Sequence, residues 1–161
     1  MNVEQLNTKV WQDPVYFLAF GFGSGLLPWV PGTWGTLAAI PLYLLIASCN
    51  PWLYLTIVVL AFVFGVLICD KVSNDLGVHD YKGIVWDEVV GYLLTLFLAP
   101  MHLGWMILGF ILFRIFDIWK PIPIRWVDRS VNGGFGIMLD NVLAAIPAWL
   151  ILQLLIRSFA A

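Results

Sequence analysis

The stretch IVWDEVVG, residues 84–91, places two adjacent carboxylates, Asp87 and Glu88, inside an apolar run, and the following YLLTLFLAP carries no charge. Composition makes this placement informative. The chain is 61% hydrophobic and 11% charged, whereas soluble domains are about half apolar and a quarter charged. We therefore expect an integral membrane protein, in which ionisable side chains near membrane depth are costly and usually functional.

Length and charge limit the remaining possibilities. The 161 residues suit a single domain, residues 1–161, and the net charge of −2 without a basic tract argues against a nucleic-acid partner. The opening MNVEQLNTKVWQDP has no early apolar core. Residues 1–15 are therefore predicted to form a polar lead-in on the surface and not a signal peptide.

Apolar segments predict an all-α, polytopic helical bundle. A helix needs about 20 residues to cross the hydrocarbon, with a lower limit of about 17. About five segments qualify as spans, namely 33–49, 51–69, 84–99, 101–116 and 137–157. Because several are near the minimum length, a four-span bundle is the alternative, with the fourth segment or the region 16–27 irregular. Cys49 and Cys69 fall at opposite ends of one span, so no disulfide is expected.

Loop charges predict the orientation of the bundle. Six of the eight Lys and Arg residues lie in or beside the loops 70–83 and 117–136, and the turns at Asn50 and Pro100 carry none. The positive-inside bias puts both charged loops in the cytoplasm, with the N-terminus inside and the C-terminus outside. Arg157 at the outer end is a counter-signal. In this topology the short active-site loops are cytoplasmic.

The unusual polar residues gather in that cytoplasmic layer. Asp87 and Glu88 begin one span, Asp140 lies near the start of the last, and Thr33 opens the first. Neighbouring residues on a helix point about 100° apart, so the two adjacent acids can flank a site without sharing a face. Close carboxylates repel one another unless they are protonated, paired or bound to a metal, and hard oxygen ligands suit Mg²⁺. Water-facing interfacial charges are the alternative.

A second cluster is cationic. Arg114, Asp117 and Lys120 are spaced three apart and share one face of a helix end, which Pro121 terminates. One interpretation is a phosphate clamp, with Arg114 as a planar fork and Lys120 as a point charge. The other is a salt-bridged helix terminus whose long side chains reach toward water.

Glycine segments and one histidine complete the candidates. The segment 21–35 includes Gly32, and the run before the last span includes Gly134. Such glycines let backbone amides approach an anion, and they also allow close helix packing. His79, next to Asp80, is either an acid/base group or an ordinary loop histidine. The chain lacks the motifs of Cys- and His-dependent phosphatases, which argues against a covalent Cys or His mechanism.

Four blocks in order carry a family resemblance: GFGSGLLPWVPGTWGTLAAIP, DLGVHDYKGIVWDEVVG, FRIFDIWKPIPIRWVDR and NGGFGIMLDNVLAA. Over roughly residues 15–156 the chain resembles the phosphatidylglycerophosphatase A family of the bacterial inner membrane. The resemblance implies a Mg²⁺-dependent hydrolase that converts phosphatidylglycerophosphate to phosphatidylglycerol and inorganic phosphate. The acidic motif of the family falls on Asp87 and Glu88, and its arginine–aspartate–lysine motif falls on Arg114, Asp117 and Lys120.

One position departs from the family pattern. The last block usually reads GIM-x-DD, and its second acid falls here on Asn141. An amide keeps an oxygen ligand but no charge, so the change would weaken metal binding or remove a base. Both natural variation and an impaired or substrate-trapping form fit the sequence.

These residues suggest metal-assisted phosphomonoester hydrolysis. Asp87, Glu88, Asp140 and Asn141 are the expected Mg²⁺ ligands. The expected substrate-binding residues are Gly32, Thr33, Arg114, Asp117, Lys120 and Gly134, and Asp75, His79 or Asp80 would supply a proton to the leaving group. Water attack and an acyl-phosphate on Asp140 both remain open. A small cation carrier is the alternative, although a carrier needs ligands near the bilayer midplane; a structural subunit is the third possibility.

Overall fold

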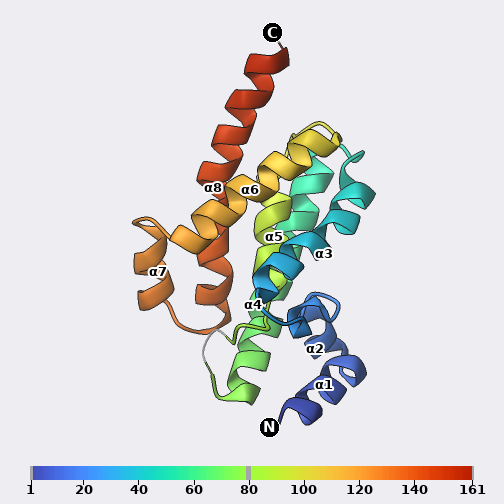
Figure 1. Cartoon of the computed structure of the whole chain (residues 1–161), viewed down its shortest axis with the longest axis vertical. Helices are drawn as coiled ribbons and strands as arrows, with labels where there is room; N and C mark the ends of the chain where they lie inside the picture. Colours follow the sequence, from blue (N-terminus) through green and yellow to red (C-terminus); the bar gives the residue numbers. More distant parts are fainter. Residues whose placement is uncertain (1, 79–80, 161) are drawn as a thin grey trace.

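The computed structural model describes residues 2–78 and 81–160. Within these ranges the chain forms helices and turns without a β-strand, which confirms the predicted all-α class. The first and last helices end at opposite ends of the long axis of the molecule (Figure 1). In chain order the elements are α1 (Val3–Gln12), α2 (Pro14–Ala19), the 3₁₀ helix η1 (Ser24–Leu26), α3 (Pro31–Ile46), α4 (Pro51–Leu76), α5 (Trp86–Thr95), α6 (Leu103–Trp119), α7 (Ile124–Ser130) and α8 (Gly133–Ala160).

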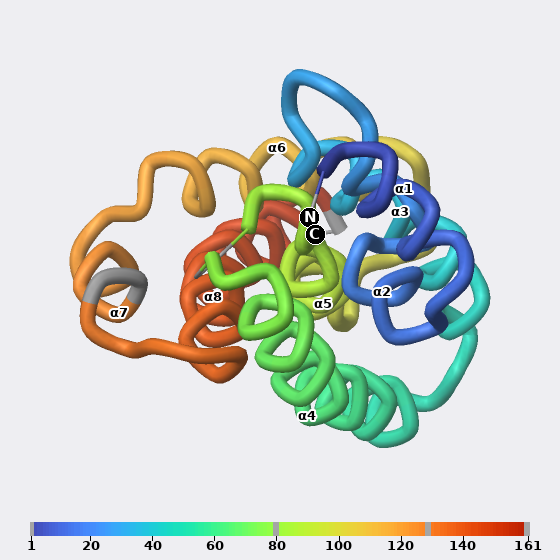
Figure 2. The backbone as a smooth tube through the Cα atoms, turned by 90° about the horizontal axis from the view of Figure 1, so that it is seen from below, coloured from blue at the N-terminus to red at the C-terminus, as the bar shows by residue number. Residues whose placement is uncertain are grey.

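Helix α5, which carries the two acids of the opening stretch, is the centre of the bundle. It packs against α3, α4, α6 and α8, which surround it when the molecule is viewed from below (Figure 2). Its buried side includes Asp87 together with apolar residues such as Val89, Val90 and Leu93. The central helix therefore contacts protein on nearly all sides, and its apolar character serves the core of the bundle.

The predicted span 84–99 is corrected by the length of α5. The helix begins at Trp86 and ends at Thr95, and the chain then turns, with Leu98 at a φ of +62°. Ten helical residues extend about 15 Å, half the thickness of a hydrocarbon core of about 30 Å. Hydropathy counted residues 96–99 as helix because this turn is as apolar as a spanning segment.

Among the residues that the structure describes, two helices are long and apolar enough to cross a membrane. They are α4, with 26 residues, and the segment Gly133–Phe159 of α8, with 27 residues; only 28% and 22% of their most apolar windows are buried. Residues such as Leu60, Leu67 and Leu154 are exposed on their outer faces. A core helix of a soluble protein would hide such side chains, so these faces suit contact with lipid.

The other predicted spans correspond to shorter helices. The segment 33–49 is mostly α3, a 16-residue helix with Pro41 inside, and 101–116 lies mainly in the 17-residue α6. The described part of the polar lead-in forms α1, Asp13 and the first two residues of α2. Helix α2 packs against α4, and Lys9 of α1 forms an ion pair with Asp75 near the end of α4. Cys49 and Cys69 form no disulfide, as expected.

Helix α4 has clear start and stop signals. Pro51 occupies its first turn, and the side chain of Asn50 accepts a hydrogen bond of 2.9 Å from the backbone N–H of Leu53. At the other end, Gly77 takes the left-handed conformation at a φ of +66°. These caps hold the charged end of α4 beside the start of α8.

Gly134 joins α4 to α8 by close packing. Its backbone N–H donates a hydrogen bond of 2.9 Å to Oδ1 of Asp70. A Cβ atom at Gly134 would lie 2.0 Å from the carbonyl oxygen of Val66 and 2.6 Å from the amide nitrogen of Asp70. The glycine is therefore required because two helix backbones approach each other there.

We expect Gly134→Ala to destabilise the protein by about 2 kcal/mol or more, because overpacking against rigid backbone forces the helices apart. Thermal unfolding in detergent measures the effect. Gly104→Ala is the matched control, since a Cβ there comes no closer than 3.2 Å to the His102 side chain in an exposed helix turn. Equal melting temperatures for the two variants would contradict the packing role of Gly134.

Candidate functional site

The predicted acidic and cationic residues meet at one cavity of about 620 Å³. It lies where α3 and α5 begin and α6 ends, beside the second turn of α8. The first turn of α3 contributes Val30, Pro31 and Gly32, so the positive end of that helix dipole faces the cavity. The charged and amide side chains that line it are Lys82, Asp87, Glu88, Arg114, Asp117, Lys120, Asp140 and Asn141.

The amide of Asn141 connects the acids of α5 and α8. Its Nδ2 donates a hydrogen bond of 2.6 Å to Oδ2 of Asp87 and one of 3.3 Å to Oδ1 of Asp140. All three residues are at most 5% exposed. Two buried carboxylates are thus held around one neutral donor, which reduces their mutual repulsion.

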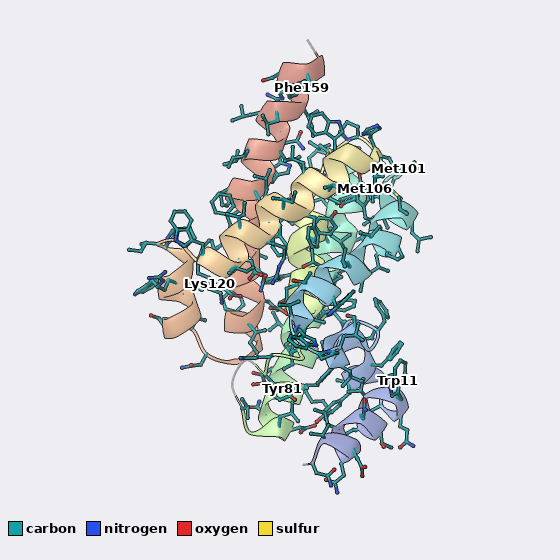
Figure 3. The ribbon with its side chains drawn as sticks, in the orientation of Figure 1. Trp11, Tyr81, Met101, Met106, Lys120 and Phe159 are labelled. Atoms are coloured by element: carbon teal, nitrogen blue, oxygen red, sulfur yellow. The ribbon has the colours of Figure 1, made fainter. Side chains whose placement is uncertain are left out.

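Lys120 supplies a cation to the same group. Its Nζ donates a hydrogen bond of 2.6 Å to Oδ2 of Asp140. The residue ends α6 in the left-handed conformation, at a φ of +43°, where glycine or asparagine is usual. Figure 3 shows Lys120 near the junction of α6 and α7. The chain therefore keeps a long cationic side chain at a position that favours glycine, and backbone strain of this kind clusters at functional sites.

Arg114 forms the second ion pair, which is also largely buried. Its Nη1 donates a hydrogen bond of 2.5 Å to Oδ2 of Asp117 and lies 4.0 Å from Oε1 of Glu88. Gly32 makes this packing possible, because a Cβ atom there would lie 2.2 Å from that Glu88 oxygen. Arg114 is held in place by Asp117 on its own helix and faces Glu88 across the cavity.

Buried oxygens indicate room for a further ligand. Oε2 of Glu88 and Oδ1 of Asn141 have no hydrogen-bond partner among the described residues. A buried oxygen without a partner costs free energy unless a donor or a cation satisfies it. No group of three or more His, Cys, Asp or Glu side chains able to hold a metal ion occurs in residues 2–78 and 81–160. At position 141 an amide stands in place of an acid, and it lies between the carboxylates of Asp87 and Asp140.

Several sequence-predicted residues lie elsewhere. Thr33 is half-buried one residue beyond the lining of the cavity, and Gly134 is bound to Asp70 at the α4–α8 contact. Asp75 forms ion pairs with Lys9 and Lys71 at the end of α4. None of the three lines the cavity, and the roles proposed for them stay predictions. His79 and Asp80 lie outside the described residues.

Other lining residues were missed in the sequence. Lys82 was counted only as a loop charge, although it precedes the acidic block by a few residues. Trp29, Val30 and Ile118 also border the cavity. In so apolar a chain, the sequence does not distinguish an apolar residue beside a polar site from any other apolar residue. The spacing of Pro28 and Pro31 does indicate an irregular segment.

Fold and site together define a helical protein with two long apolar helices and a largely buried, charge-paired cavity among the residues that the structure describes. The family model for Phosphatidylglycerophosphatase A matches residues 17–156, and the chain belongs to that family of phosphatases. No solved structure matches the chain.

Curated relatives agree with this membership. A Phosphatidylglycerophosphatase A of Escherichia coli is 50% identical over 136 residues, which cover 83% of this chain and 78% of the relative. The protein of the same name from Haemophilus influenzae is 46% identical, covering 84% and 85%. A protein of Bacteroides thetaiotaomicron named Putative phosphatidylinositol-3-phosphatase is 37% identical, covering 82% and 87%.

The strained conformation of Lys120 can be measured by substitution. Lys120→Gly and Lys120→Ala both remove the ammonium from Asp140, but only glycine suits a positive φ. We expect the glycine variant to be more stable than the alanine variant by about 1–2 kcal/mol. Chemical unfolding in detergent gives the difference. Equal stabilities would mean that the end of α6 does not keep its left-handed geometry.

Proposed function

We propose that the protein hydrolyses the terminal phosphomonoester of phosphatidylglycerophosphate, giving phosphatidylglycerol and inorganic phosphate. The observation that carries this proposal is the pair of partly buried cations, Arg114 and Lys120, each bound to a carboxylate in the same cavity. Membership of the family gives the reaction class, and the names of two relatives give the substrate.

The cations have distinct roles in this scheme. Arg114 binds two phosphate oxygens as a planar fork, and Asp117 keeps its guanidinium oriented. Lys120 neutralises the charge that moves to the leaving oxygen, and Asp140 positions its ammonium. Both cations are already ordered before substrate binds, so little reorganisation is needed in the transition state.

Mg²⁺ is the cofactor we propose, and the donor set supports it. Mg²⁺ commonly binds proteins through one or two carboxylates and completes its shell with water and substrate phosphate. Asp87, Asp140 and Asn141 are neighbouring residues with hard oxygen donors, and Oδ1 of Asn141 has no hydrogen-bond partner among the described residues. Glu88, the fourth predicted ligand, lies toward Arg114. When bound, the ion would neutralise phosphate charge as a Lewis acid.

A water molecule is the nucleophile we favour over Asp140. Oδ1 of Asp140 accepts hydrogen bonds from the backbone and side chain of Asn141, and Oδ2 accepts one from Lys120. Attack by Asp140 would break these bonds. Oε2 of Glu88 has no such bond among the described residues and is our choice to accept the proton of the water. His79 and Asp80 stay proposed proton donors to the leaving oxygen.

The proposed setting is the bacterial inner membrane, with the site at its cytoplasmic face. The loop charges support this orientation. Helices α4 and α8 would cross fully, and α3, α5 and α6 would complete a multi-pass bundle of about five segments. Helix α1 and the end of α8 lie at opposite ends of the molecule (Figure 1), which agrees with chain ends on opposite sides of the membrane. A cation carrier is less well supported, because Asp87 and Glu88 lie in the first turn of α5 and not midway along a spanning helix.

Phosphate release in detergent tests the proposal. We expect Mg²⁺-dependent release from phosphatidylglycerophosphate and little from phosphatidylinositol 3-phosphate, the alternative suggested by the Bacteroides relative. Arg114→Lys should lower kcat on the order of 100-fold, since it keeps the charge and loses the fork. Arg157→Lys, at the far end of α8, is the control. No release from any lipid phosphate by folded protein would refute a phosphatase.

The amide at position 141 predicts a change in metal response. Asn141→Asp removes the donor between Asp87 and Asp140 and adds a third carboxylate. We therefore expect its melting temperature to fall below that of the wild type in chelator and to rise more steeply with Mg²⁺. Parallel thermal titrations measure both effects. Identical Mg²⁺ responses of the two proteins would place the metal elsewhere.

A further inference from the structure

The cavity has a charged interior and an apolar border. Trp29 and Val30 border it before α3, and Ile118 borders it from α6. These three side chains are 94%, 52% and 71% exposed, whereas Asp87 and Asp140 are each 5% exposed. The same cavity therefore leads from buried charges to large apolar side chains on the surface.

Further exposed apolar residues follow Ile118 in the sequence. Trp119 and Ile122 follow Ile118 and are 66% and 86% exposed. We define the apolar rim as Trp29, Val30, Ile118, Trp119 and Ile122. It is built from two segments far apart in the sequence. Large exposed apolar patches mark interaction surfaces, and tryptophan is enriched where protein meets the membrane interface.

Trp29 is held outward by an uncommon backbone conformation. Its φ is +83°, in the left-handed region that a bulky residue rarely adopts. Pro28 and Pro31 flank it and restrict the chain on both sides. A tryptophan that served only the core would not need this geometry, so the conformation indicates a role for the exposed ring.

We propose that the apolar rim is a lateral lipid portal, through which one phospholipid reaches the cavity from the bilayer. The inference rests on the proposed function. The terminal phosphate of the lipid lies among Arg114, Lys120 and the acids. The glycerol of its diacylglycerol part and the first acyl carbons lie between Trp29 and Ile118. The occupant is the diacylglycerol end of that same lipid.

The complementarity of charge and polarity favours this occupant. An anionic headgroup needs the cations of the interior, and its ester-linked chains need apolar surface continuous with the bilayer. The two halves of an amphiphile thus match the two parts of the cavity. A water-soluble phosphomonoester would gain nothing from the apolar rim, so these residues select lipids over soluble phosphates.

Kinetics in mixed micelles of phosphatidylglycerophosphate test the portal. Trp29→Ser and Ile118→Ser should each raise KM about tenfold while kcat stays within about twofold, as expected when a large apolar contact to the substrate is lost. Matched controls are Trp52→Ser, 81% exposed at the start of α4, and Ile107→Ser, 51% exposed on α6 away from the cavity. Thermal unfolding verifies that all four variants fold.

The outcomes separate the portal from the reaction. Rim variants that behave like the controls overturn the portal and leave the phosphatase intact. A wild type that releases no phosphate overturns the phosphatase. In that case a diacyl phosphatidic acid with a photoreactive group near the ester carbonyl still tests the portal. Cross-links at Trp29 or Ile118 support it, and cross-links confined to the outer faces of α4 and α8 overturn it.

Discussion

The hydrogen bonds from Asn141 to Asp87 and Asp140 are the interaction on which the site depends. They join the central helix α5 to the long helix α8 at a point where both carboxylates are almost fully buried. Buried charges are tolerated only when they are paired and hydrogen-bonded. The amide and the ammonium of Lys120 supply that compensation, so the positions of α5, α6 and α8 are mutually constrained through polar groups in an otherwise apolar bundle.

Small residues make this arrangement possible. Gly91 brings α5 close to α8, because a Cβ there would lie 2.7 Å from the Phe113 ring and 3.1 Å from the carbonyl oxygen of Asn141. Gly32 gives Glu88 its place beside Arg114. Where lipid surrounds a protein, helix association depends on close packing more than on the hydrophobic effect. These glycines are therefore needed for the close packing that positions the charged side chains.

A phosphatase of this design needs no separate soluble domain. The charged groups lie near the ends of α3, α5, α6 and α8, and α4 and α8 provide the apolar outer faces. In our proposal the same chain thus carries the phosphate-binding groups, the membrane anchorage and an apolar border for the substrate. The proposed functional groups lie at helix ends, where backbone dipoles and side-chain charges act together.

The sequence by itself determined the all-α class, the long apolar helices and the chemical composition of the site. Composition and spacing suffice for these because hydropathy and motif residues are local properties. It also indicated Asp87, Glu88, Arg114, Asp117, Lys120, Asp140 and Asn141, all of which line one cavity. Only the tertiary structure decided that α5 is a short buried helix, since apolar residues look alike whether they face lipid or protein. Which residues contact one another also depends on how distant segments meet in space. Asn141 bridges two acids, and Gly134 allows two helices to pack closely. Trp29 reaches the cavity border because distant segments meet there.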